Sequence, residues 1–211
     1  MKITILTAIL IVAPAAAFAQ TWEVGVDGGV GLLNTVNVTG APGSATAGFA
    51  PGFVAGGFVS ENLYRHISGE IHYEFMQSNL RLASGGQTAQ FKGVAHAIHY
   101  DVAYHTGTGE SNARFFVALG GGIKTFVGNG TEAAVQPLSQ YGYFTKTKSV
   151  KPMGTVSVGF TAHISHNLSL RGEIRGITSP FPEAVLTPPA GVKYGTMLTE
   201  IVPMVSIVFG K

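Results

Sequence analysis

The chain has 211 residues, contains no cysteine, and is poor in charge, with 11% Asp, Glu, Lys and Arg against about 25% in ordinary soluble domains. The lack of cysteine excludes disulfides, thiolate metal sites and a cysteine nucleophile. The formal net charge is only +2 and the seven histidines are scattered, so no basic stripe indicates a nucleic-acid partner.

The N-terminal residues have the pattern of a secretory signal peptide. Lys2 precedes an apolar run over residues 3–12, and Ala17-Phe18-Ala19 offers small residues at both positions that a signal peptidase inspects. The alternative, a membrane anchor, requires a longer apolar run. We therefore predict a signal peptide over residues 1–19, cleavage before Gln20, and one mature domain over residues 20–211.

Beyond the signal, apolar residues alternate with small or polar ones, and no stretch of about 18 apolar residues could form a spanning helix. The clearest segment places Ile71, Tyr73 and Phe75 on one face and His72 and Glu74 on the other, which is the period of a strand. The second segment is rich in glycine and leaves its facing ambiguous. The eight predicted strands are 22–33, 49–59, 63–77, 91–104, 114–127, 150–162, 167–178 and 197–209.

The connections between these strands alternate in length. The short ones are 60–62, 105–113 and 163–166, and the long ones are 34–48, 78–90, 128–149 and 179–196. Membrane barrels have short periplasmic turns and long outer loops, whereas a soluble sandwich has no reason to sort its loops in this way. The pattern predicts an all-β fold, an eight-stranded antiparallel up-and-down transmembrane β-barrel. A soluble lipocalin-like barrel is the structural alternative.

Charged and histidine side chains fall on the face that would line the interior. The predicted interior set is Asp27, Glu70, His72, Glu74, His99, Asp101, Arg114, Lys124, Lys151, Arg171, Glu173, Arg175 and Glu200. An eight-stranded barrel is about wide enough for side chains to fill it, and buried charges must be paired. One interpretation is a salt-bridged plug, and the other is a narrow conducting path lined by the same ions.

Aromatic residues lie near the ends of the predicted strands, on the apolar face. The predicted membrane-interface set is Trp22, Tyr73, Phe75, Tyr104, Phe115, Phe160 and Phe209. Two girdles of aromatic side chains are typical of a membrane barrel. Ordinary packing of strand aromatics in a core is the alternative.

These features resemble the OmpA/OmpX-like, opacity-type family of small outer-membrane β-barrel proteins. The resemblance covers residues 20–211 and rests on the signal followed by residues 22–26, on residues 115–124, and on the last strand, 201–209. It implies a bacterial outer-membrane location, contact with membrane lipid and lipopolysaccharide, and assembly by periplasmic chaperones and the outer-membrane insertion machinery. Phe209 is followed by Gly210-Lys211, whereas family members often end on an aromatic residue.

Two patterns invite a chemical interpretation. His163-Ile164-Ser165, with Glu173 as an orienting acid, is similar to the spacing in lipid A deacylases, but the predicted topology places it in a periplasmic turn, and a triad is defined by geometry. His72 and His99, with neighbouring carboxylates, have no recognised metal-ligand spacing, so hydrogen bonding inside the barrel is expected instead. We predict no catalytic residue, metal or cofactor.

The favoured function is a non-enzymatic envelope-structural or surface-interaction barrel that acts through four long extracellular loops. These loops are rich in Gly, Ser, Thr, Asn and Pro, and could either bind a surface ligand or form variable solvent-exposed segments. A small passive channel is the alternative function, and a lipid A-modifying hydrolase ranks below it.

Overall fold

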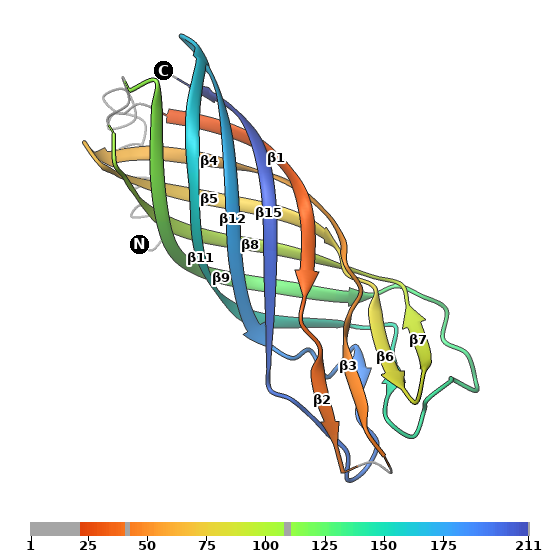
Figure 1. Cartoon of the computed structure of the whole chain (residues 1–211). Helices are drawn as coiled ribbons and strands as arrows, with labels where there is room; N and C mark the ends of the chain where they lie inside the picture. Colours follow the sequence, from red (N-terminus) through yellow and green to blue (C-terminus); the bar gives the residue numbers. More distant parts are fainter. Residues whose placement is uncertain (1–21, 41–42, 108–110, 211) are drawn as a thin grey trace, which may run out of the picture.

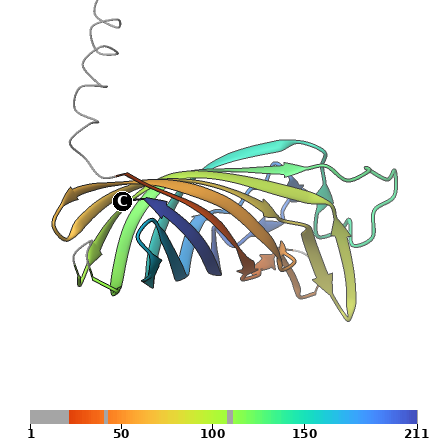
Figure 2. The ribbon, with the colours of Figure 1, turned by 90° about the horizontal axis from the view of Figure 1, so that it is seen from above.

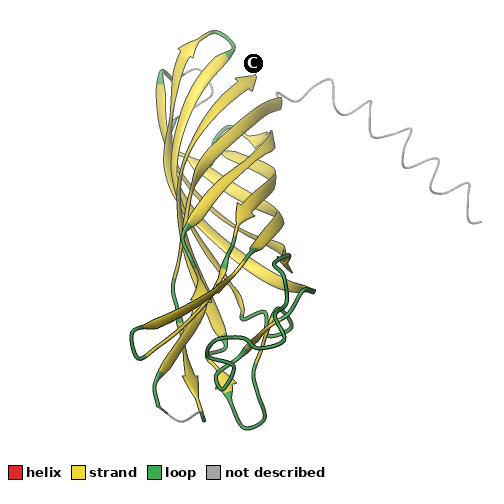
Figure 3. Ribbon diagram, turned by 90° about the vertical axis from the view of Figure 1, so that its right-hand side faces the viewer, coloured by secondary structure: helices red, strands yellow, loops and turns green. Residues whose placement is uncertain are grey.

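The computed structural model describes residues 22–40, 43–107 and 111–210, and its described residues form strands joined by turns and loops (Figure 3). The predicted signal peptide lies outside the described residues. No helix in the described part of the chain is long and apolar enough to cross a membrane.

Eight long strands close into a barrel (Figure 1). Around the ring their order is β1-β15-β12-β11-β9-β8-β5-β4, and each pairs antiparallel with both neighbours. The predicted eight-stranded up-and-down barrel is therefore confirmed. The strands are β1 (Trp22–Leu33), β4 (Gly52–Tyr64), β5 (Ile67–Gln77), β8 (Gly93–His105), β9 (Ala113–Gly128), β11 (Lys148–Ser165), β12 (Leu168–Pro180) and β15 (Met197–Gly210).

The first short turn lies later than the sequence indicated. The sequence predicted the first short connection at 60–62, but β4 continues to Tyr64 and the turn comprises Arg65 and His66. The β4–β5 ladder continues past Asn62, with a register shift between Asn62 and Tyr64. Ladder hydrogen bonds to β5 therefore extend β4 beyond its predicted end. A similar shift between His163 and Ser165 lengthens β11.

The barrel distributes polarity in the reverse of a soluble protein. Outward side chains such as Val26 and Leu119 are 62% and 69% exposed, whereas the inward Glu74 and Arg175 are both 0% exposed. The glycine-rich β4 follows the same rule, with Phe53 outside. Such an apolar outer surface is stable against hydrocarbon rather than water.

At the end of the barrel away from Gly210, the long connections fold into a second unit, the loop module. It comprises the described residues of segments 34–51, 78–92, 129–147 and 181–196. Figure 2 shows this module beyond the barrel end that is opposite the C-terminus. We call the barrel end next to the module the loop end, and the other end the terminal end.

The loop module contains seven short strands in segments where the sequence predicted loops, except that Phe49 and Phe91 were predicted as the first residues of barrel strands. Five form a sheet in the order β14-β2-β3-β6-β7, called here the outer sheet, and β10 pairs with β13. These strands are β2 (Val36–Thr39), β3 (Ala45–Phe49), β6 (Leu80–Ser84), β7 (Gln87–Phe91), β10 (Tyr143–Phe144), β13 (Leu186–Thr187) and β14 (Lys193–Tyr194).

The loop module and the barrel share one apolar core. Leu82 and Leu186 of the module are fully buried in the same cluster as Ala97, Phe126 and Val202 of the barrel wall. The ring of Phe49 stacks on that of Phe126, with centroids 5.3 Å apart. Side chains from both units thus fill the interior at the loop end.

Candidate functional site

Ion pairs connect opposite walls in the middle of the barrel. β12 and β5 are separated by three strands in either direction around the ring, so their inward side chains face each other across the interior. Arg171 donates from Nη1 and Nη2 to the two carboxylate oxygens of Glu70, at 2.9 and 3.0 Å. Arg175 pairs with Glu74. Such bidentate, charge-assisted bonds fix geometry well.

Glu173 lies between the two arginines and connects them. Its Oε2 is 2.9 Å from Nη2 of Arg171, and its Oε1 is 2.8 Å from Nη2 of Arg175. The spacing of two residues along β12 places all three side chains on the inward face. Alternation in the sequence is therefore sufficient to assemble this row.

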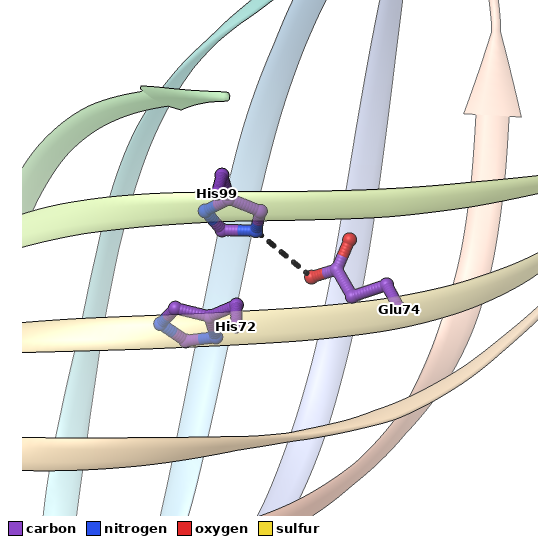
Figure 4. Close-up of side chains that lie close together, drawn as sticks. All are labelled: His72, Glu74 and His99. Atoms are coloured by element: carbon purple, nitrogen blue, oxygen red, sulfur yellow. Dashed lines mark ion pairs between the residues drawn. The ribbon is translucent and has the colours of Figure 1, made fainter. Parts of the chain in front are cut away.

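Two stacked histidines complete the cluster (Figure 4). The rings of His72 and His99 are nearly parallel, with centroids 4.7 Å apart. His72 Nε2 is 3.0 Å from Glu70, and His99 Nδ1 is 2.8 Å from Asp101. The remaining nitrogens, His72 Nδ1 and His99 Nε2, face the Arg175 guanidinium at 3.3 and 3.1 Å.

The ring nitrogens have two kinds of neighbour. A guanidinium only donates, so His72 Nδ1, which faces Arg175, accepts, whereas His99 Nε2 lies between the guanidinium and Glu74 Oε1, which is 3.7 Å away (Figure 4). His72, Glu74 and His99 each offer one potential metal-ligand atom, and these atoms lie within 4.8 Å of one another. Carboxylate-backed imidazoles of this kind orient the ligands in metal sites. In this protein the cation among them is the guanidinium of Arg175.

The cluster contains more acids than arginines. Five buried carboxylates, those of Asp27, Glu70, Glu74, Asp101 and Glu173, accompany Arg171 and Arg175. Asp27 lies across Gly56 from Glu74 in the strand register. Neither oxygen of Asp27, nor Oε2 of Glu74, has a hydrogen-bond partner among the described residues. The middle of the barrel therefore holds five carboxyl groups against two guanidinium groups among the described residues.

Two further pairs flank the central cluster. Arg114 donates to Glu23 at 2.7 Å at the terminal end, and Lys124 pairs with Glu200 towards the loop end. Arg171 stacks over Phe116, 3.9 Å from the ring centroid. Aromatic and ionic side chains thus fill the same layers of the interior.

Most of the predicted interior residues lie together, but Lys151 differs. The residues that are buried inside the barrel are Asp27, Glu70, His72, Glu74, His99, Asp101, Arg114, Lys124, Arg171, Glu173, Arg175 and Glu200. Lys151 lies directly opposite Lys124 in the register, on the same face, but is only half-buried. Like charge repels it from Lys124, and it has no ion pair with any described residue.

Further inward residues take part in the polar network beside the predicted set. They include Glu23, Ser68, His105 and Thr155, which hydrogen bond to Arg114, to each other, or to Asp101. Each has the parity of an inward position in its strand. The strand alternation places Glu23, Ser68 and Thr155 on the polar face, whereas His105 lies in the predicted connection 105–113.

The described residues form serine–histidine pairs without a third member. Ser68 Oγ is 2.8 Å from His105 Nε2, and Ser169 Oγ is 2.6 Å from His163 Nδ1. His105 Nδ1 and His163 Nε2 have no partner in the described ranges. Neither pair therefore has the acid that orients the imidazole in a catalytic triad. Glu173 forms ion pairs with Arg171 and Arg175 instead.

The predicted interface aromatics lie on the outside of the barrel. Exposed members are Trp22, Tyr73, Tyr104, Phe115, Phe160 and Phe209. Phe75 is half-buried, because its ring packs against Phe53 with centroids 5.6 Å apart. Tyr73 bonds through its hydroxyl to His96 Nδ1 at 2.9 Å.

Solved structures show the same fold. The outer membrane protein OprG from Pseudomonas aeruginosa has a TM-score of 0.55 at 10% identity, covering 90% of this chain and 95% of that one. Neisserial surface protein A has a TM-score of 0.50 at 12% identity, covering 88% and 96%. No family model and no curated protein matches the sequence. The shared feature is the small closed barrel.

Proposed function

We propose that the chain is a non-enzymatic protein of the bacterial outer membrane, whose barrel anchors a preformed binding module on the cell surface. The observation that carries this proposal is the shared core, in which barrel residue Phe126 packs against module residue Phe49. A loop that folds as a sheet and packs on a rigid wall presents a surface with little entropy left to lose on binding.

The outer-membrane location is supported by the apolar exterior of the barrel and by the solved structures that share its fold. The structures that share it include an outer membrane protein and a surface protein. In the proposed orientation the short turns face the periplasm and the loop module faces outward. Residues 1–19 would direct export, and the insertion machinery and periplasmic chaperones would assemble residues 20–211 among lipid and lipopolysaccharide.

The orientation has a direct test. An epitope inserted between Gly85 and Gly86, which form the β6–β7 turn, is expected to label intact cells with antibody. The matched control carries the epitope between Arg65 and His66, and is expected to label only after the outer membrane is permeabilised. The reverse pattern would contradict the proposal.

We further propose that the interior is a plug rather than a path. Ion pairs from opposite walls and an apolar layer at the loop end support this proposal, because side chains of both kinds extend into the interior. Residues 20–211 reconstituted in planar bilayers are expected to give no stable unitary currents. Stable currents that change when Arg171 is replaced by Gln would favour the passive channel instead.

A further inference from the structure

The exposed face of the outer sheet carries a groove. The cavity measures about 480 Å³. It lies over β2, β3, β6 and β7, on the side away from the shared apolar core. Its lining residues are Asn37, Ser44, Ala45, Thr46, Arg81, Ala83, Ser84, Gly85, Gly86, Gln87 and Thr88.

Short side chains make the groove hollow. The register places Asn37, Thr46, Ala83 and Thr88 in one row across the four strands. At one end the hairpin turns through Gly85 and Gly86, which have positive φ angles and open space around them. The four side chains of this row are short, and three of them are polar, so they form the floor of a polar trough.

Arg81 is the one charged residue in this lining, and it makes no hydrogen bond or ion pair with any residue that the structure describes. Its Nε atom is buried without an acceptor. A guanidinium has five donors and cannot lose its charge. An acceptor that enters the groove would therefore satisfy a donor that is shielded from water.

The surrounding charge also favours an anion. In the four segments of the loop module the sequence contains four basic residues, Arg81, Lys92, Lys146 and Lys193, against two acids, Glu132 and Glu183. Segment 34–51, which forms one wall of the groove, has no charged residue. An approaching anion therefore meets an attractive field without a nearby carboxylate.

We propose that this groove binds an anionic saccharide. The hydroxyls of Ser44, Thr46 and Thr88 and two amides can both donate to and accept from sugar hydroxyls, while the Ser84 hydroxyl already donates to the Ser44 carbonyl. Arg81 can hold a carboxylate or sulfate through two parallel bonds. No aromatic residue lines the groove, so bases have no stacking platform. Because each sugar unit contributes little binding free energy alone, the expected ligand is a polymer with a repeating anionic unit. The inference rests on the outward orientation of the loop module proposed above.

The experiment measures binding of polysaccharides to residues 20–211 in detergent micelles by calorimetry. Heparin supplies sulfates, polygalacturonate supplies carboxylates, and dextran is the neutral control. We expect one or both polyanions to bind more tightly than dextran, with affinity that falls as salt rises. Equal binding of all three, or of none, overturns the inference.

Three variants separate the groove from general electrostatics. Arg81→Gln is expected to weaken polyanion binding by about tenfold or more, because the charge-assisted bonds of the guanidinium are lost. Lys193→Gln removes an equal charge from β14, outside the groove, and is expected to leave affinity nearly unchanged. Ala83→Leu keeps every charge but fills the trough, and is expected to weaken binding as well.

Equal losses for Arg81→Gln and Lys193→Gln would show a diffuse charge effect and overturn the site. Each variant is first tested for the heat-modifiable gel migration of a closed barrel, so that misfolding is recognised. Because the epitope test on intact cells uses no saccharide, cells that label at Gly85 while the protein binds no polyanion would refute this inference alone.

Discussion

The middle of the barrel and its loop end are equally buried, but they are held together by different forces. In the middle, Arg171 and Arg175 pair with acids on the opposite wall. At the loop end, Leu82, Phe126 and Leu186 pack in an apolar cluster. Removing one partner of such a buried ion pair lowers the free energy of unfolding by several kcal/mol. Truncating an apolar side chain lowers the free energy of unfolding by an amount that grows with the cavity left behind.

This difference predicts which part of the protein unfolds cooperatively. Ion pairs join strands that have no ladder contact with each other, so each broken pair affects the closed ring. The apolar cluster joins the ring to short strands, so its failure can stay local. The barrel is expected to unfold as one unit, and the loop module is expected to open without it.

The largest expected effect follows from replacing Arg175 by Met. Glu74 and Glu173 would then lose a buried partner, and the free energy of unfolding should fall by about 3–5 kcal/mol. A urea titration of the folded gel band in lipid vesicles measures it. The control, Arg65→Met in the exposed β4–β5 turn, should change stability by less than about 0.5 kcal/mol. Equal effects of the two variants would remove the distinction.

Replacing Leu82 by Ala tests the other region. The loop module should lose about 2–5 kcal/mol of local stability, because a fully buried side chain is truncated. Proteolysis should then cut near the β6–β7 turn while the gel migration of the closed barrel persists. Gln90→Ala, on the exposed face of β7, is the matched control. If the barrel and the loop module unfolded together, the claim of local opening would be wrong.

A third prediction concerns the cation within the histidine cluster. In Arg175→Ala the acceptors of His72, Glu74 and His99 would face a gap of the right chemistry for Zn²⁺. Zinc at about 100 times its dissociation constant would then stabilise the variant by about 2.7 kcal/mol. Adding His99→Ala should abolish the gain, and the unaltered protein should show none. A similar zinc effect on all three proteins would show that binding occurs elsewhere.

The smallest effect is expected at Tyr194 in the loop module. Its hydroxyl donates to the Tyr141 carbonyl at 2.9 Å, and Tyr194→Phe should cost about 1 kcal/mol. Burial of the hydroxyl, reinforced by Glu183, raises the pKa of Tyr194 above its ordinary value.

The direction of that shift fixes the pH dependence. Above pH about 10 the unfolded tyrosine loses its proton while the folded one keeps it. Module stability should therefore fall as pH rises beyond about 10, and the fall should be smaller in Tyr194→Phe. Protease sensitivity of the β6–β7 turn against pH measures both. Identical profiles for the two proteins would show that other groups control the alkaline response.

Much of the barrel could be predicted because alternation is local. The bounds of β1 follow from residues 22–33 alone, and the inward positions of Glu70, Glu74 and Glu173 follow from the same period. The β4–β5 turn was misplaced because its position depends on ladder bonds between β4 and β5, which continue past Asn62. Alternation within one segment does not show where pairing with a neighbouring strand ends.

The loop strands carried a signal that the prediction did not use. Leu80 and Leu82 alternate before Gly85-Gly86, and Ala89 and Phe91 alternate after it, which is the pattern of a hairpin. The specific ion pairs could not be predicted in the same way. Which arginine meets which acid depends on the stagger of strands that are about 100 residues apart in the chain, as in Arg171 and Glu70.

The shared core also sets an order of assembly. Ten of the 27 buried side chains in this cluster of described residues, including Phe126, Ile177 and Val202, belong to barrel strands. Before the ring closes, the loop segments lack the barrel part of their apolar core, so their short strands have no complete surface to pack against. We therefore expect the outer sheet to form last, after the barrel has closed.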